Sequence, residues 1–363
     1  MKTERNENFT FTGLSEKESK NLLIFDLIKS KNVISRTEIA KDTGINMVSV
    51  SNYIKSFVES GLLYDRGPDV STGGRKPELM ELAAVDGGAL GISIDGCEAE
   101  VVLTDLNARL IEKRRSSLED LPRLASELCA AINSRGVSIK AAGVGYETGD
   151  PKPILKQISD AVKIPVFAGR NVCCAAFGER SLNNKASCDG VLYVHSSLGE
   201  CVLIRDCQIL SACDKQGESA RYLRPWGRAL SIEAMAKEEV LKGVGTKIVH
   251  IAGADMNKIT GSSVVEASKE GDEVAGGIVE SVGINLGLRI AYLINIFTPK
   301  IVIIGGGIEE AGEALLSGIK RTVGRLAHLS ASKDISIIPS ALGSNGMALG
   351  ASALAVRELF LRS

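Results

Sequence analysis

The sequence predicts an α/β protein with a smaller helical module in front of it. Residues 16–63 have helical periodicity and contain few Gly or Pro residues. From Ala89 onward, short β-branched segments alternate with Gly-rich turns and amphipathic helices, which is typical of α/β architecture. The Asp-Gly-Gly sequence at residues 86–88 interrupts the pattern between these regions. We therefore place a domain boundary at residues 84–88.

Composition limits the class of protein. The chain has 363 residues, 44% hydrophobic and 24% charged, which fits a soluble protein of two or three domains. No apolar run approaches the ~18 residues that a membrane span needs, and the polar first eight residues do not fit a secretion signal. Its eight scattered cysteines form no C-x-C or C-x-x-C pair, which favours a reducing cytoplasm. The net charge of −1 means that any nucleic-acid site must be local.

Two helices are predicted at the start of the N-terminal module. The first runs from about Glu16 to Ser30 and would bury one apolar stripe. That stripe consists of Leu23, Ile24, Leu27 and Ile28. The second covers Arg36–Asp42: Ser35 and Glu38 form an S-x-x-E capping box, and Gly44 can turn the chain sharply.

A third helix is predicted after Ile45, with Asn46 as its N-cap. Its apolar residues recur at i, i+3, i+4, i+7 and i+8, so one stripe is buried: Val50, Tyr53, Ile54, Phe57 and Val58. The opposite face carries slim or polar side chains, followed by one cation: Met47, Val48, Ser49, Ser51, Asn52 and Lys55. A helix that enters the major groove of DNA needs small donors and acceptors near its N-terminus. This face therefore predicts base contacts.

A hairpin is predicted at residues 67–82, with Arg75 and Lys76 at its tip, and it would form the wing of a winged helix-turn-helix. The predicted DNA-contact residues are Arg36, Thr37, Asn46, Met47, Ser49, Ser51, Asn52, Lys55, Arg75 and Lys76. The alternative is a three-helix dimerisation or scaffold module. Residues 16–84 contain ten basic and ten acidic residues, which favours that alternative because the basic footprint is weak. The capping box, the polar helix face and the basic wing together favour DNA binding.

Several motifs in a fixed order resemble those of the ROK family of repressors, open reading frames and sugar kinases. They are the Gly-Gly-Arg-Lys-Pro wing at 73–77, Pro165–Phe167, Ala175–Glu179, Thr298–Gly307 and Ala341–Ala353. The resemblance covers nearly the whole chain. It implies a winged helix-turn-helix followed by a body of two actin-like or hexokinase-like (ribonuclease H-like) α/β lobes.

The resemblance also implies an order of domains. Residues 1–15 are expected to be a flexible N-terminus, and residues 16–84 the winged helix-turn-helix. The first lobe would cover residues 85–185, with 345–363 returning to it. The second lobe and the oligomerisation region would cover residues 186–344.

The chain departs from the kinases of this family at the positions that carry chemistry. The D-x-G-x-T motif is replaced by Ser93–Cys97, and the E-N-D motif that supplies the catalytic carboxylate is replaced by Gly169–Asn171. An amide cannot accept the proton of the attacking sugar hydroxyl. The G-x-G-x-G phosphate turn has become Ser197–Cys201, with a Glu inside it. The resemblance therefore predicts a body without kinase activity.

Metal and sugar positions are altered as well. The sugar-contacting E-x-G-H motif matches Glu218–Arg221 and keeps only the Glu, and the family's zinc cysteine motif is missing. Gly305–Gly307 could bring a helix N-terminus to a phosphate, but the two acidic residues after it favour a structural turn. We expect no metal and no cofactor. The candidate effector-binding residues are Arg170, Asn171, Glu218 and Arg221.

The sequence thus predicts a repressor of the ROK type. Its expected partners are double-stranded operator DNA, a sugar-like effector and a second or further copy of the chain, as a homodimer or homotetramer. Two alternatives remain open at this point. One is a sugar kinase with an added DNA-binding domain, and the other is a regulator that a protein partner controls.

Overall fold

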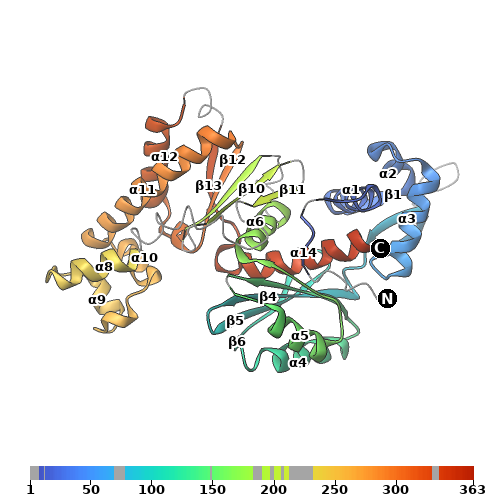
Figure 1. Cartoon of the computed structure of the whole chain (residues 1–363), viewed down its shortest axis with the longest axis horizontal. Helices are drawn as coiled ribbons and strands as arrows, with labels where there is room; N and C mark the ends of the chain where they lie inside the picture. Colours follow the sequence, from blue (N-terminus) through green and yellow to red (C-terminus); the bar gives the residue numbers. More distant parts are fainter. Residues whose placement is uncertain are drawn as a thin grey trace. The chain divides into compact units, whose positions relative to one another are not determined.

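A computed structural model describes residues 8–11, 13–68, 78–147, 149–182, 190–196, 200–205, 208–211, 232–328 and 335–363. Contacts divide the chain into two compact units. Unit 1 comprises Met1–Gly178 and Met347–Ser363, and unit 2 comprises Glu179–Gly346. Figure 1 shows that each unit has its own β-sheet with helices against it, as the predicted α/β class requires. The N-terminal module belongs to unit 1.

The N-terminal module consists of three helices and a small antiparallel sheet with strand order β1-β3-β2. Its elements are α1 (Glu16–Lys31), β1 (Val33–Ser35), α2 (Arg36–Thr43), α3 (Met47–Glu59), β2 (Leu63–Pro68) and β3 (Glu78–Leu82). The predicted capping box forms, because Ser35 accepts from the Glu38 amide while Glu38 accepts from that of Ser35. Gly44 ends α2 with a φ of 70°, a left-handed conformation that favours glycine.

The buried stripe of α1 differs from the predicted one. Leu23 is 47% exposed, while Leu22 and Phe25 are buried together with Ile24 and Ile28. The prediction for Leu23 was wrong because two stripes, offset by one residue, run along this helix. The periodicity is satisfied by either stripe, and only the packing against the rest of unit 1 selects one.

The larger sheet of unit 1 has strand order β6-β5-β4-β7-β8. Its strands are β4 (Gly87–Asp95), β5 (Glu98–Asp105), β6 (Leu110–Ser117), β7 (Ser138–Tyr146) and β8 (Val166–Arg170), and its helices are α4 (Leu121–Asn133), α5 (Lys152–Val162), α6 (Asn171–Leu182) and α14 (Gly346–Arg362). Leu90 and Val144 pack in one cluster with α4 and α5, while the alternate residues Gly91 and Gly143 face α14. Because side chains alternate across a sheet, α14 lies on the opposite face from α4 and α5.

Unit 2 is built on a sheet with strand order β11-β10-β9-β12-β13. Its strands are β9 (Val191–His195), β10 (Glu200–Arg205), β11 (Gln208–Ser211), β12 (Ile301–Gly305) and β13 (Ser336–Pro339), and its helices include α8 (Ile232–Leu241), α9 (Lys247–Ile251), α10 (Gly261–Lys269), α11 (Glu273–Phe297) and α12 (Glu313–Leu326). By length and composition α11 could cross a membrane, although the sequence contains only core-sized apolar runs. Half of its most apolar window is buried within the protein, which fits a core helix.

The N-terminus contains ordered residues where a flexible segment was expected. Asn8 pairs with Ala168 of β8 in a parallel bridge, and the Phe9 amide donates to the Ala168 carbonyl at 2.8 Å. The Phe9 side chain is buried. Residues 8–11 thus pack against the sheet of unit 1, while the flexibility expected for residues 1–15 stays a prediction. Phe9 lies among polar residues in the sequence, so no pattern there indicates that its ring packs against β8 at the edge of the sheet.

Candidate DNA-binding face and effector site

The first candidate site is the outer face of α3. The Asn46 side chain accepts from the Ser49 amide at 2.9 Å, so it caps the helix as predicted. On the inner face Val50, Ile54 and Phe57 are fully buried. This capped and anchored helix presents its other face to solvent.

The predicted contact residues that the structure describes gather on this module. Thr37, Asn46, Met47, Asn52 and Lys55 are exposed, and Arg36, Ser49 and Ser51 are half-buried. The arrangement suits recognition of DNA, because small hydroxyl and amide groups on a helix can reach base edges in the major groove. Arg75 and Lys76 lie outside the described residues.

Two cations of the predicted set already have partners. The Arg36 guanidinium lies 3.3 Å from Glu78 and 3.7 Å from Asp65, so two carboxylates draw it towards the wing strands. Lys55 lies 3.8 Å from Glu59 in an exposed pair, which solvent screens. Lys55 is therefore the better placed of the two for a phosphate.

Sequence reasoning placed Val48 on this face but left it out of the contact set. It is 72% exposed, more than any large hydrophobic residue around it on α3. A slim apolar side chain at the start of a recognition helix can contact the methyl group of thymine. Val48 could have been identified from the sequence, because an aliphatic residue is unusual on the solvent face of a helix, where charged residues are common.

The second candidate site surrounds the position that would hold a kinase's catalytic carboxylate. Asn171 begins α6 and is only 2% exposed. Its amide nitrogen donates to the Ile94 carbonyl at 2.8 Å, and its oxygen accepts from the Ser93 hydroxyl at 3.3 Å. A Cβ on Gly145 would stand 2.3 Å from the same oxygen. Asn171 thus joins β4 to α6, with one hydrogen bond at its amide nitrogen and one at its oxygen.

The other candidate effector residues are not brought together with Asn171 into one described site. Arg170 is half-buried at the end of β8. Glu218 and Arg221 lie outside the described residues. Ser93, which replaces the first carboxylate of the family motif, is buried and also lies 3.5 Å from the Met347 sulfur at the start of α14.

The glycine turn of unit 2 is closely packed. A Cβ on Gly305 would stand 2.2 Å from the Tyr193 hydroxyl, and Gly306 and Gly307 have φ values of 101° and 94°. Beyond the turn, Glu309 is 6% exposed, and burial raises the pKa of its carboxyl to about 7. In its ionised form this acid would oppose a phosphate next to the turn, so a structural role for Gly305–Gly307 stays our prediction.

A small cavity lies beside this turn in unit 2, with a volume of about 100 Å³, below the ~300 Å³ at which ligand pockets usually begin. His195 and Glu200 line it and are buried, and burial lowers the pKa of His195 to about 4. Within the described ranges, no three His, Cys, Asp or Glu side chains are grouped so that they could hold a metal ion. This cavity is therefore too small for a sugar, unlike the hollow of about 1430 Å³ in unit 1 that Lys140, Lys152 and Arg362 help to line.

Comparison with known proteins places this geometry in context. Residues 232–358 match the model of the ROK family. Over 94% of its length, the chain is 23% identical to a protein named xylose repressor from Caldicellulosiruptor bescii, of which it covers 96%. It is 22% identical to the DNA-binding transcriptional dual regulator NagC of Escherichia coli, again over 94% of this chain and over 93% of the relative.

Two solved structures show the fold. A ROK family transcriptional regulator, a homologue of the E. coli MLC protein, superposes with a TM-score of 0.76 at 16% identity, over 95% of this chain and 96% of its own. A ROK family glucokinase from Streptomyces griseus superposes with a TM-score of 0.60 at 20% identity, over 74% of this chain and 99% of its own. The predicted fold class, a winged helix-turn-helix with a sugar-kinase-like body, is thereby confirmed.

Proposed function

The chain carries a ROK family domain, and from this premise we propose that it is a transcriptional repressor that binds operator DNA through α3. The observation that carries the proposal is the outer face of α3, where Ser51, Asn52 and Lys55 surround the exposed Val48. Similarity over nearly the whole chain to proteins named as repressors supports it. The protein acts in the cytoplasm, where its DNA is.

The body of this repressor is not a kinase. Asn171 stands at the position of the catalytic carboxylate, is buried, and uses its amide to bridge Ile94 and Ser93. Loss of a general base typically lowers a rate ~10²–10⁴-fold. The body instead senses a sugar-like effector. The relatives named after xylose and N-acetylglucosamine support that class of ligand.

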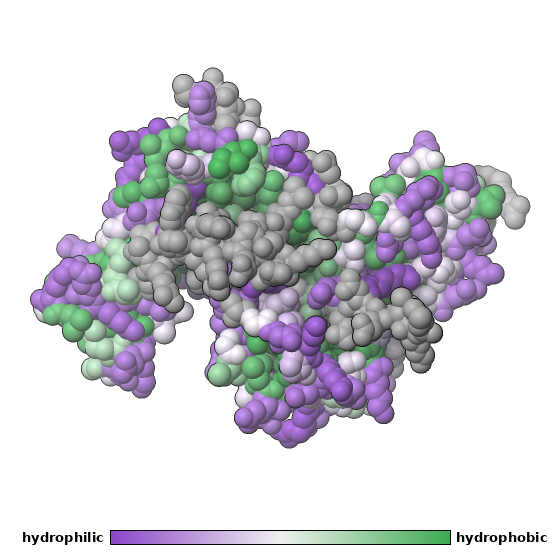
Figure 2. Space-filling view, in the orientation of Figure 1, coloured by the Kyte–Doolittle hydropathy of each residue, from purple (hydrophilic) through white to green (hydrophobic). Residues whose placement is uncertain are grey.

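The repressor acts as a homodimer formed through α11. Four exposed apolar residues recur on α11 at intervals of four, namely Ile284, Leu288, Tyr292 and Ile296, and we call them the α11 stripe. Figure 2 shows exposed hydrophobic residues over α11 and α12. A continuous apolar stripe of this kind marks a protein interface. A second copy suits it, because two-fold related subunits bury the same patch and match an inverted-repeat operator.

The test of the function has two parts. Genomic fragments from the source organism that the purified protein retains are sequenced, and their binding is measured by fluorescence anisotropy. We expect one inverted-repeat sequence, bound at least ~10³-fold more tightly than unrelated DNA. Equal affinity for all fragments would contradict the proposal.

The second part addresses the body. The protein is titrated by calorimetry with xylose, glucose, N-acetylglucosamine and their phosphates, and assayed for phosphorylation of each sugar with ATP. We expect no phosphorylation, and weakened operator binding in the presence of one of these ligands. Phosphate transfer would favour a kinase with an added DNA-binding domain. Absence of any ligand effect would favour control by a protein partner.

A further inference from the structure

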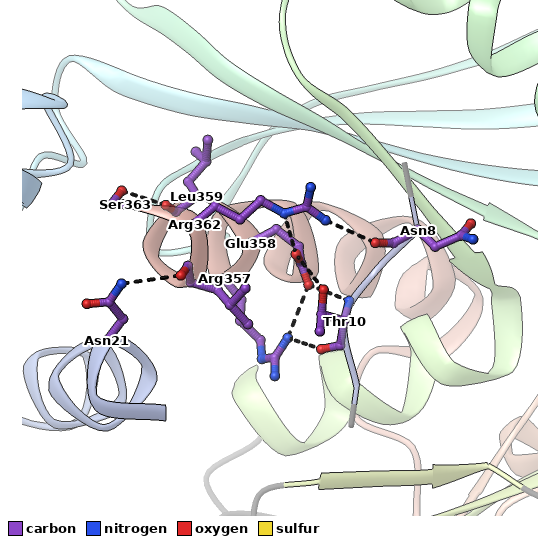
Figure 3. Close-up of polar contacts among 9 residues, drawn as sticks. Asn8, Thr10, Asn21, Arg357, Glu358, Leu359, Arg362 and Ser363 are labelled. Atoms are coloured by element: carbon purple, nitrogen blue, oxygen red, sulfur yellow. Dashed lines mark hydrogen bonds and ion pairs between the residues drawn. The ribbon is translucent and has the colours of Figure 1, made fainter. Parts of the chain in front are cut away.

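Residues at the two ends of the chain meet in unit 1. Asn8, Phe9, Thr10 and Phe11, which we call the strap, run beside the last turn of α14, more than 340 residues away in the sequence. Figure 3 shows Glu358 and Arg362 of α14 pointing towards the strap backbone. The strap comes directly before the DNA-binding module, which begins with α1 at Glu16.

Glu358 is the centre of the polar contacts. Its carboxylate is fully buried and accepts from the Thr10 amide at 2.7 Å and from the Thr10 hydroxyl at 3.3 Å. It also accepts from Arg357 at 3.3 Å and from Arg362 at 3.0 Å. The same two guanidiniums donate to the strap, Arg357 to the Thr10 carbonyl at 2.7 Å and Arg362 to the Asn8 carbonyl at 3.1 Å. A buried carboxylate requires such partners, so the strap helps to neutralise and solvate Glu358.

An apolar anchor holds the strap on the other side. The Phe9 ring lies over two glycines of the sheet: a Cβ on Gly169 would stand 2.6 Å from it, and a Cβ on Gly143 would stand 3.2 Å from it. Phe167 and Phe11 flank the ring, with centroids at 6.4 and 6.1 Å. The absence of side chains at these two positions admits the aromatic ring against β7 and β8.

The same turn of α14 also holds the DNA-binding module. Phe360 stacks on Phe25 of α1 with centroids 4.5 Å apart, and meets the edge of Phe57 of α3 at 4.9 Å. Asn21 of α1 donates to the Leu361 carbonyl at 3.2 Å, and Lys17 donates to the Ser363 carbonyl at 2.7 Å. Phe57 lies on the recognition helix itself, so α14 contacts the element that reads DNA.

We propose that the strap and the last turn of α14 form a latch that fixes the orientation of the DNA-binding module on the body, with Glu358 as its central positioning residue. A module joined to the body only by the segment after β3 could pivot about that segment. The latch adds the strap before α1 and the Phe360 contact to α3. The segment after β3, the strap and the Phe360 contact together restrain that pivot.

The consequence concerns paired half-sites and rests on the proposed function. When one module of a dimer has bound its half-site, the second module is held at a high effective concentration near the other half-site. This increases affinity only if the geometry lets both modules bind at the same time. Rigid modules restrict binding to one half-site spacing, whereas pivoting modules accept several. The latch therefore sets operator spacing, while α3 sets operator sequence.

The experiment uses the full chain and three kinds of DNA: the operator, the operator with its centre lengthened or shortened by one to four base pairs, and a single half-site. Thr10→Pro removes the amide that donates to Glu358, and Phe9→Ala removes the apolar anchor. We expect both variants to bind the half-site as the parent does. We expect them to bind the operator about tenfold more weakly and to lose the preference for one spacing, because avidity depends on geometry.

Two controls separate positioning from stability. Ile319→Ala removes several buried side-chain carbons in unit 2 and causes a loss of packing comparable to that of Phe9→Ala, and Glu16→Ala breaks an exposed pair on α1. Both should keep the parent's spacing preference. Glu358→Gln keeps the shape of the buried group and should relax the preference if it folds, as judged by circular dichroism.

An unchanged spacing preference in Thr10→Pro and Phe9→Ala, with half-site binding intact, would overturn the latch. Equal loss of half-site and operator binding in these variants would also overturn it, since the strap would then support the fold of α3 alone. Failure of the parent to bind any half-site would instead count against the proposed function.

Discussion

At Asn171, Ser93 and Glu309, polar side chains are buried, and the first two lie in segments that resemble kinase motifs of the family. Asn171 and Ser93 hydrogen-bond to each other and close the sheet against α6. Glu309 follows a glycine turn, and burial raises the pKa of its carboxyl. Asn171 and Ser93 therefore have a packing role, and we expect a different set of side chains to contact DNA.

The outer face of α3 gives the first prediction. Replacing Ser51, Asn52 and Lys55 together by Ala should abolish preference for the operator, since each lost base contact costs ~1–3 kcal/mol. Competition binding against unrelated DNA measures the preference. Lys20→Ala, an exposed change on α1, serves as the control and should preserve it. Retained preference in the triple variant would mean that another element reads the sequence.

Glu309 gives a prediction on pH. Its pKa rises from 4.5 to about 7 on folding, so the folded state holds the proton more tightly than the unfolded state. The stability that it contributes is complete below pH 4.5 and is lost as the pH rises towards 7. Glu309→Gln should therefore unfold at nearly the parent's temperature at pH 4.5, and be more stable than the parent by about 3 kcal/mol at pH 8.

Thermal or urea unfolding at pH 4.5, 6 and 8 measures this difference. Glu310→Gln, at the next position along the chain, is the matched control and should show a much flatter difference from the parent. A constant difference between Glu309→Gln and the parent across the three pH values would show that Glu309 is ionised in the folded protein.

Helix α14 packs with its backbone very close to the backbones of neighbouring elements. It crosses the sheet where a Cβ on Gly91 would stand 2.0 Å from the Ala348 carbonyl oxygen, and one on Gly143 would stand 1.9 Å from that of Ala351. Gly350 of α14 itself lies close to α6: a Cβ at Gly350 would stand 1.8 Å from the Cys174 carbonyl oxygen. Glycines on three elements thus let the backbones touch, and the helix is held firmly from the sheet to the DNA-binding module.

Gly143→Ala tests this packing. The added methyl group would meet backbone rather than a movable side chain, so we expect a loss of about 3 kcal/mol in the free energy of unfolding. Gly276→Ala on α11 is the control, because no atom lies within 4 Å of the added group and alanine favours a helix by up to ~1 kcal/mol. Urea unfolding measures both, and an unchanged midpoint for Gly143→Ala would contradict the close contact.

At the scale of the whole molecule, the α11 stripe predicts assembly. Leu288→Glu with Ile296→Glu should convert the dimer to a monomer, because burying two unpaired carboxylates in an apolar interface is costly. Sedimentation at micromolar concentration measures the mass. Leu241→Glu, at an even more exposed apolar position on α8, should leave the mass unchanged. A variant of the stripe that stays dimeric would assign the interface elsewhere.

Local patterns were enough to predict the elements from the sequence. The capping box at Ser35, the glycine at Gly44 and the 3.6-residue periodicity of α3 each act within one or two turns, so they hold in any surroundings. The strands after Ala89 follow from β-branched segments for the same reason. The candidate DNA-binding face could also be predicted, because it consists of the α3 residues that lie outside the clear buried stripe of that helix.

Only the tertiary structure decided which of two stripes α1 buries, that Phe9 has a binding place on β8, and that Glu358 lies in the interior with Thr10 as partner. The longest of these contacts, between Thr10 and Glu358, joins residues 348 positions apart. No periodicity or spacing in the sequence predicts these contacts. They are stabilised only when segments far apart in the sequence come together and exclude water from their apolar surfaces. The sequence by itself determined the elements and predicted a DNA-contacting face on α3, whereas the fold determined how α3 is held.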